Sequence, residues 1–205
     1  MLLRIVITAL VCYFLGNHNG AICVSTMLGD DVRSHGSGNA GLTNFIRNFG
    51  PGRAAMVIVI DAGKAVLSCV LGGLLFPEAP IAGRLLGGIC AMLGHDFPAL
   101  QGFRGGKGIL SGCFVAIAVD WRVAVLVAIV FFTVYFLTKY VSLSSILAAA
   151  AFGIGFAIIH HDDVLLVTGS IFISLLTIFQ HRSNITRLIH GKESKTDLFQ
   201  KGTKS

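Results

Sequence analysis

Residues 54–76, AAMVIVIDAGKAVLSCVLGGLLF, form the stretch that decides the fold. A helix needs about 20 consecutive, mostly apolar residues to cross the hydrocarbon core of a bilayer, and this stretch meets that requirement. Its two charged side chains, Asp61 and Lys64, are three positions apart. Residues at this spacing share a helix face, so we expect the two to form a pair inside the membrane.

The composition of the whole chain agrees with a membrane location. Of 205 residues, 54% are hydrophobic and 13% are charged, and the mean hydropathy is +0.80. Soluble domains are about one-quarter charged, so these values exclude a soluble enzyme and a disordered chain. A transmembrane β-barrel is excluded because its strands would alternate apolar and polar residues. We therefore expect an all-α, polytopic membrane bundle in which residues 1–205 form a single domain.

Apolar runs predict about seven transmembrane helices. The further runs are 2–28, 81–94, 109–137, 141–159 and 164–180. The first is interrupted by Asn17-His18-Asn19, and no small-residue cleavage pattern follows it, so we interpret it as a retained helix. The run 109–137 is interrupted by Asp120-Trp121-Arg122; the count of seven treats it as two short spans, and one span is the alternative. Gly83 and Gly87 have the spacing that lets helices pack closely.

Lysine and arginine divide unequally between the two faces that seven spans create. Twelve of the sixteen lie on one face and three on the other, while Lys64 lies within the membrane. The positive-inside rule places the richer face in the cytoplasm, with the N-terminus outside and the C-terminus inside. The polar tail, residues 195–205, is expected to lack order.

The cysteines and histidines do not predict a metal centre. All five cysteines lie in apolar stretches, and none belongs to a CxxC pair or lies near a histidine cluster. Packing as small hydrophobic side chains accounts for them. We therefore expect neither a metal nor a cofactor.

The first polar segment, residues 29–53, contains RSHGSGNAGLTNFIRNFGPGR from Arg33 onward. Its glycines match the dinucleotide pattern GxGxxG, but that pattern is meaningful only between a strand and a helix of a soluble domain. Glycines that free backbone N–H groups, together with amide, hydroxyl and guanidinium side chains, are suited to bind a phosphate. The candidate ligands are Gly36, Ser37, Gly38, Asn39, Gly41, Thr43, Asn44 and Arg47.

The second polar segment, residues 94–108, reads GHDFPALQGFRGGKG. It is not a Walker A loop, because Gln101 and Gly108 occupy the positions of the first glycine and the magnesium-binding hydroxyl. Two cations among glycines just before an apolar span still favour anion binding at a helix N-terminus. The candidate residues are His95, Arg104, Gly105, Gly106, Lys107 and Gly108.

The third polar segment, residues 181–194, reads HRSNITRLIHGKES. Asn184 and Arg187 are three positions apart and would share one face of a helix. Asn184 is a candidate catalytic residue, Arg187 is a candidate phosphate ligand, and His181 is the leading candidate for a general base.

Three quoted stretches resemble a known family: GSGNAGLTNFIR (36–47), GHDFP with FRGGKG (94–108) and HRSNITRLIHGKE (181–193). They are similar, in order, to the three cytoplasmic motifs of bacterial acyl-phosphate-dependent glycerol-3-phosphate acyltransferases, and Asp61 with Lys64 resembles the DxxKG element of that family. The positions that depart from the family pattern are Asn17, Asn19, Ala65, Arg104 and Ser111.

The resemblance implies transfer of an acyl group from an acyl phosphate to the 1-hydroxyl of sn-glycerol 3-phosphate. The products would be lysophosphatidic acid and phosphate, for phospholipid synthesis at the cytoplasmic face of the bacterial inner membrane. The expected partners are the two substrates and membrane lipids, with no nucleic acid. An organic-phosphate transporter is the alternative, but it would have two similar halves, and the glycine-rich segments are not repeated.

Two mechanisms are compatible with these residues. No histidine is followed five positions later by an aspartate, so the dyad of thioester-dependent acyltransferases is absent. This favours direct attack by the hydroxyl, with the leaving phosphate accepting its proton. In this mechanism Ser37 orients the reactants and Asn184 completes the site. A covalent acyl-Ser37 intermediate is the competing mechanism.

Overall fold

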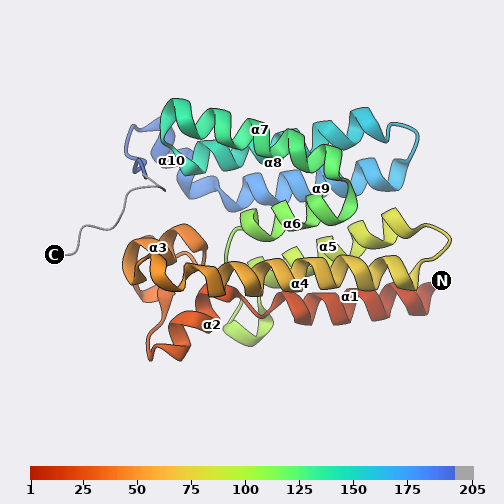
Figure 1. Cartoon of the computed structure of the whole chain (residues 1–205), viewed down its shortest axis with the longest axis horizontal. Helices are drawn as coiled ribbons and strands as arrows, with labels where there is room; N and C mark the ends of the chain where they lie inside the picture. The colour runs from red at the N-terminus through yellow and green to blue at the C-terminus, as the bar shows by residue number, and fades with distance from the viewer. Residues whose placement is uncertain (197–205) are drawn as a thin grey trace. The chain divides into compact units, whose positions relative to one another are not determined.

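The computed structural model describes residues 1–196, and this part of the chain contains ten α-helices and no strand (Figure 1). The expectation of an all-α protein is confirmed. The helices are α1 Leu2–Gly16, α2 Gly20–Met27, α3 Leu42–Phe49, α4 Ala54–Leu75, α5 Pro80–Asp96, α6 Ile109–Val119, α7 Trp121–Thr138, α8 Val141–Ile159, α9 Val164–Gln180 and α10 Arg182–Ile189. Most of the predicted polar tail, residues 197–205, lies outside the described residues.

Among the described residues, three helical stretches are long and apolar enough to cross a membrane: Pro51–Leu75, Trp121–Thr138 and Val141–Ile159. The pairs α1 with α2 and α9 with α10 bring the number to five if each pair, bent by 41° and 56°, is one span. A total of seven spans, and the side on which each terminus lies, stay predictions.

Both breaks that the sequence indicated are present. Asn17 ends α1, and the side chain of Asn19 accepts a hydrogen bond from the N–H of Ile22 at the start of α2. Asp120 separates α6 from α7, and its carboxylate accepts from the N–H of Arg122 in the first turn of α7. These contacts are N-caps, in which a side chain satisfies a backbone donor left over at a helix start.

The chain divides into two compact units, Met1–Val119 and a second beginning at Asp120. In the first unit, α5 packs closely on α4, where a Cβ added at Gly87 would collide with the carbonyl of Ser68. The spacing of Gly83 and Gly87 thus marks a real close contact. In the second unit, α8 packs against both α7 and α9.

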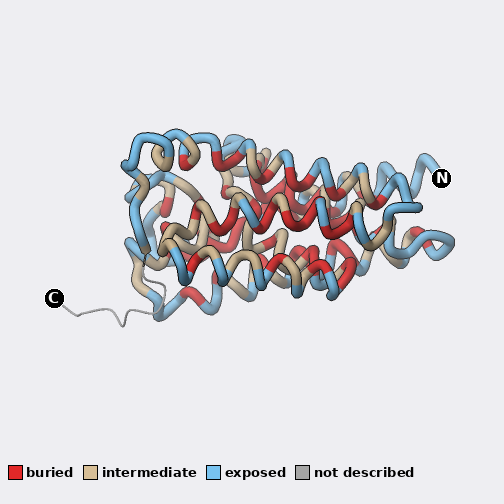
Figure 2. Tube along the Cα trace, turned by 90° about the horizontal axis from the view of Figure 1, so that it is seen from above, coloured by how far each residue is buried: buried red, intermediate tan, exposed pale blue. Residues whose placement is uncertain are grey.

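Many large apolar side chains on the helices are exposed, among them Leu74 at 73%, Ile129 at 59% and Leu175 at 62%. Buried and exposed positions alternate along the helices, as Figure 2 shows. Water would disfavour so much exposed apolar surface, whereas lipid chains solvate it at no cost. The burial pattern is therefore that of helices whose outer faces contact a bilayer.

Candidate active site

The buried pair Asp61 and Lys64 holds the break between α1 and α2. Nζ of Lys64 lies 2.8 Å from Oδ1 of Asp61, and their side chains are 4% and 1% exposed. Asp61 accepts a hydrogen bond of 3.0 Å from the N–H of Gly20. Lys64 donates to the carbonyls of Gly16 and His18 at 3.2 and 3.1 Å. The negative carboxylate of Asp61 thus binds the N-terminus of α2, and the positive ammonium group of Lys64 binds the C-terminus of α1. The helix dipoles favour both arrangements.

His95, near the end of α5, belongs to the same buried cluster. Its Nδ1 lies 2.7 Å from Nζ of Lys64 and 3.4 Å from Oδ1 of Asp61. An ammonium group can only donate, so Nδ1 accepts and the proton of the neutral imidazole is on Nε2. Oγ of Ser111 also approaches Nδ1, at 3.5 Å. Because Asp61 and Ser111 approach the same nitrogen, they do not form a serine–histidine–aspartate relay through this ring.

The backbone of the second polar segment rests directly on His95. The N–H of Gly106 donates to the carbonyl of His95 at 3.1 Å. A Cβ added at Gly106 would collide with Nε2 of His95 and would lie 2.8 Å from the carbonyl oxygen of Ala40. Only glycine lets the backbone approach this closely, which explains one glycine of the segment without invoking a ligand. His95 is 3% exposed and lies beneath the segment.

Asn44 on α3 organises the first polar segment from within. Its Oδ1 accepts from the N–H of Ser37 at 3.1 Å, and its Nδ2 lies within 3.1 Å of three backbone carbonyl oxygens, those of Val32, His35 and Asn39. Asn44 is 3% exposed. Its amide therefore shapes the loop that presents Ser37, and a direct contact of Asn44 with substrate stays a prediction.

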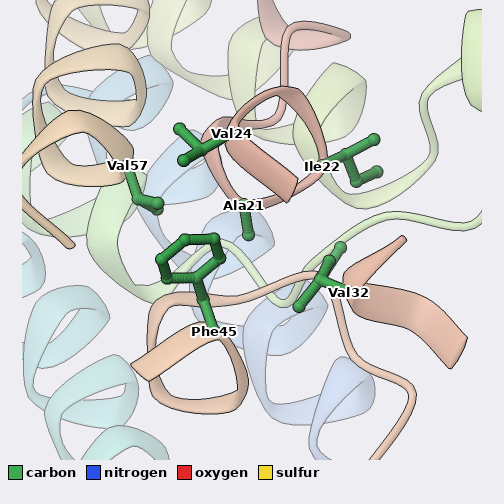
Figure 3. Packing of buried hydrophobic residues seen from close by; sticks show 7 residues of the cluster. Ala21, Ile22, Val24, Val32, Phe45 and Val57 are labelled. Carbon is green, nitrogen blue, oxygen red and sulfur yellow. The ribbon is translucent and has the colours of Figure 1, made fainter. Parts of the chain in front are cut away.

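A hydrophobic cluster anchors the first polar segment to the helices below it. Phe45, on the buried face of α3, packs with Ala21, Val32 and Val57, and Figure 3 shows its ring pointing toward this group. The other members of the cluster are Ile22, Val24 and Ala40. The opposite face of α3 carries the exposed Arg47. Burial of Phe45 thus orients the helix so that Arg47 faces outward.

The first two polar segments lie together in the first unit. The N–H of Ala40 donates to the carbonyl of Gly105 at 3.4 Å. Nη1 of Arg33 donates to the carbonyls of Gln101 and Arg104 at 2.8 and 3.2 Å, while Asp31 neutralises its charge. Sequence reasoning missed Arg33, and a basic residue shortly before the glycines was the only signal for it.

The candidate ligands of these two segments differ in exposure. Ser37, Arg47 and Arg104 are exposed, while Thr43 and Lys107 are half-buried. Of the remaining glycines and amides, Gly36 and Gly38 are exposed, Asn39, Gly41 and Gly105 are half-buried, and Gly108 is buried. The structure therefore gathers a serine hydroxyl and several cations around two adjoining glycine-rich loops, which is the chemistry needed to hold phosphate groups.

The third polar segment belongs to the second unit, on α10 and the residues after it. Nδ2 of Asn184 donates to Oε1 of Glu193 at 2.7 Å, and Nε of Arg187 donates to Oε2 at 2.6 Å. Burial opposes ionisation of Glu193, but these hydrogen bonds outweigh it and lower its pKa. Nδ1 of His181 donates to the carbonyl of Thr177 at 2.8 Å. No signal in the sequence assigned a role to Glu193, whereas the structure shows that it orients both Asn184 and Arg187.

Within residues 1–196, no group of three histidine, cysteine or acidic side chains is arranged to hold a metal ion. The five cysteines are unpaired thiols in buried or half-buried positions.

Comparison with known proteins gives concordant results. A family model described as glycerol-3-phosphate acyltransferase matches residues 6–191. The glycerol-3-phosphate acyltransferase of Finegoldia magna is 38% identical over 194 residues, which cover 94% of this chain and 96% of that protein. The corresponding protein of Staphylococcus carnosus is 37% identical, with 94% and 98% covered.

A solved structure is similar as well. The crystal structure of PlsY (YgiH), an integral membrane glycerol 3-phosphate acyltransferase, in its glycerol 3-phosphate form has a TM-score of 0.85 and 30% sequence identity. The match covers 96% of this chain and 99% of that one. A second structure of PlsY, in a lysophosphatidic acid form, matches with a TM-score of 0.83.

Proposed function

This chain belongs to the glycerol-3-phosphate acyltransferase family, and from this premise we propose that it acylates glycerol 3-phosphate with an acyl phosphate as donor. The acyl group goes to the 1-hydroxyl of sn-glycerol 3-phosphate. The products are 1-acyl-glycerol 3-phosphate and inorganic phosphate. The chain is an integral membrane protein, and we place it in the bacterial inner membrane with its polar segments at the cytoplasmic face, where soluble glycerol 3-phosphate is present.

The observation that carries the choice of donor is the pairing of two glycine-rich loops with exposed Arg47 and Arg104 beside them. An acyl phosphate and glycerol 3-phosphate each bring a phosphate group to the reaction. Holding two anions close together near a medium of low dielectric constant requires several cations and backbone donors. A thioester donor would bring no phosphate to the reacting carbonyl. Such a donor would not need a second set of cations and backbone N–H donors at that carbonyl.

The proposed reaction is a direct displacement. The 1-hydroxyl oxygen attacks the acyl carbonyl carbon, a new ester C–O bond forms, and the C–O bond to phosphate breaks. The departing phosphate accepts the hydroxyl proton, so no strong protein base is required. His95 is not suited to act as that base, because it is buried and its Nδ1 accepts from Lys64.

Ser37 is exposed at the centre of the first segment, with its backbone N–H fixed by Asn44. In the direct mechanism its hydroxyl orients the donor or the acceptor. A covalent acyl-Ser37 intermediate remains the competing route. Rapid quenching with labelled donor separates the two, since only the covalent route leaves label on the protein before product appears.

The first experiment is phosphate release by detergent-purified protein supplied with palmitoyl phosphate, with and without glycerol 3-phosphate. Palmitoyl coenzyme A is tested in parallel. We expect phosphate release that depends on the acceptor and matches lysophosphatidic acid formed, with no product from the thioester. If folded protein forms lysophosphatidic acid with palmitoyl coenzyme A and not with palmitoyl phosphate, the proposed donor is refuted.

The residue assignments are tested by three variants, Ser37→Ala, Arg47→Ala and Asn184→Ala. Each is expected to lose at least about tenfold in kcat/KM, the scale of one charge-assisted or catalytic hydrogen bond. Thr8→Val is the matched control, because Thr8 is buried and its hydroxyl bonds only to the carbonyl of Arg4 in its own helix. Normal turnover in all three variants would show that the site lies elsewhere.

A further inference from the structure

We propose that Asn19 is a positioning residue that sets the spacing between the two glycine-rich segments of the active site. The proposal deepens the proposed function, on which it rests for the identity of the substrates. Asn19 lies in the break between α1 and α2 and is 0% exposed, so it acts through its neighbours and not by touching substrate.

The side chain of Asn19 makes two hydrogen bonds that fix its orientation. Its Oδ1 accepts from the N–H of Ile22 at 3.1 Å, and its Nδ2 donates to the carbonyl of Ala40 at 2.9 Å. Exchange of the amide oxygen and nitrogen would put donor against donor and acceptor against acceptor. Asn19 therefore has two separable roles. Its Oδ1 caps α2, and its Nδ2 binds the first glycine-rich segment at a residue 21 positions away.

The partner of Asn19 is Ala40, which, like Arg33, belongs to the first segment and hydrogen-bonds to the second segment. Ala40 is buried, and its N–H donates to the carbonyl of Gly105 in the second segment. Both backbone groups of Ala40 are thus engaged, the carbonyl by Asn19 and the N–H by Gly105. Ala40 links the fixed break in the first helix pair to the second glycine-rich loop.

The side-chain amide of Asn19 also lies next to His95, the residue on which the second segment rests. Nδ2 of Asn19 lies 3.4 Å from Nε2 of His95, and Gly106 packs on that nitrogen and against the carbonyl of Ala40. His95 in turn is held by Lys64. A shift of the Ala40 carbonyl would therefore move the backbone of Gly106. The distance between the exposed phosphate-binding groups of the two loops would change with it.

Substitution by serine separates the two roles of Asn19. Serine is an effective N-cap and preserves the bond to Ile22, but its side chain is too short to reach Ala40. We expect Asn19→Ser to fold and to raise KM for glycerol 3-phosphate about tenfold, the scale of one buried hydrogen bond, with kcat changed much less. A residue that served only to cap α2 would leave KM unchanged in this variant.

Asn19→Asp is the second variant, since it keeps the size and the cap but turns an acceptor toward the Ala40 carbonyl. We expect it to raise KM more than Asn19→Ser does. Thr8→Val, whose hydroxyl contacts only its own helix, is the control for loss of a buried hydrogen bond and should keep the wild-type KM. Wild-type KM in both Asn19 variants would overturn the proposal, and so would failure of both to fold, because Asn19 would then be a structural residue only.

Two further readouts do not depend on the acyl donor. Calorimetric titration with glycerol 3-phosphate alone should show weaker binding to Asn19→Ser than to wild type. Amide hydrogen exchange without ligand should be faster at residues 40 and 106 in Asn19→Ser and unchanged in Thr8→Val. If wild-type protein fails to use palmitoyl phosphate, the donor proposal fails, while these readouts still decide the role of Asn19: unchanged exchange at both positions would refute it.

Discussion

Nζ of Lys64 and Nδ1 of His95 lie 2.7 Å apart, although the two residues are 31 positions apart in the chain. This contact joins α4 to the end of α5, immediately below the second glycine-rich loop. Asp61 balances the charge of Lys64 and anchors the start of α2. One buried cluster therefore supports both the break in the first helix pair and the second glycine-rich loop of the candidate active site.

Replacing Lys64 by methionine should destabilise the first unit strongly. The variant leaves the carboxylate of Asp61 buried without its cation, and such a loss costs about 3–5 kcal/mol of the free energy of unfolding. Thermal unfolding in detergent measures it. The double variant Asp61→Asn with Lys64→Met should recover part of the loss, because no unpaired charge remains buried.

The exposed pair of Arg4 and Glu78 is the control for Lys64. Their side chains are 47% and 51% exposed, so solvent screens their attraction and Arg4→Met should change the unfolding midpoint little. Equal destabilisation by Arg4→Met and Lys64→Met would contradict the role given to the buried cluster.

Gly106→Ala should impair catalysis, because the added methyl group collides with Nε2 of His95 and pushes the second loop away from Ala40. We expect kcat/KM to fall at least about tenfold. Gly63→Ala is the matched control, since no atom lies within 4 Å of its added Cβ. Steady-state kinetics of both variants provide the test, and wild-type kinetics for Gly106→Ala would rule out the close approach as a functional requirement.

Glu193→Gln should reduce activity although Glu193 is not expected to touch substrate. The carboxylate orients Nδ2 of Asn184 and Nε of Arg187, and a glutamine amide would present a donor to one of these donors. We expect a loss of about tenfold in kcat/KM, with the salt bridge of Arg187 lost as well. Glu78→Gln, in an exposed pair, serves as the comparison, and an effect as large there would exclude a specific role for Glu193.

Asp120→Asn should alter how the stability of the second unit depends on pH. The hydrogen bond from the side chain of Arg122 lowers the pKa of Asp120 below its ordinary value of 3.8. His160 adds a second contact, with Nε2 2.7 Å from Oδ2. A lowered pKa stabilises the fold fully above the ordinary value, and the contribution disappears as the pH falls through the folded-state value.

The measurement for Asp120 is the unfolding midpoint of wild type and Asp120→Asn across pH. The two should differ most above about pH 5 and converge as the pH falls below about 4. Asp162→Asn, at a carboxylate that is 91% exposed, should follow the wild-type curve. A constant difference between wild type and Asp120→Asn down to low pH would contradict an ionised Asp120 as the cause.

Local rules predicted much of the fold from sequence. The apolar runs gave helices α4, α5, α8 and α9 nearly to their ends, because a helix that faces lipid must be apolar over most of its length. Breaks at Asn17–Asn19 and Asp120 followed from polar residues that can cap a helix. Pairing of Asp61 with Lys64 followed from the i, i+3 spacing.

Other features of the site were not predictable from local patterns. His95 and Asn44 were both expected as phosphate ligands, and that role stays a prediction. The structure shows what the sequence did not indicate: His95 lies under the second loop, and Asn44 is hydrogen-bonded to the backbone of the first. Imidazole and amide groups bind loops and ligands with the same atoms, so residue type and spacing do not separate the two uses. Arg33 and Asn19 were not assigned to the site for a related reason: their partners in the loops are backbone carbonyls that lie far away in sequence.

The sequence by itself determined that this protein is a helical membrane protein and where its helices break, and it predicted that three polar segments carry the chemistry. Those properties depend on the lipid solvent and on contacts within a few residues of one another. Only the tertiary structure decided which of these polar side chains are exposed and which are hydrogen-bonded to the loops themselves. That choice depends on contacts such as Asn19 with Ala40 and Lys64 with His95, which exist only once the helices have packed.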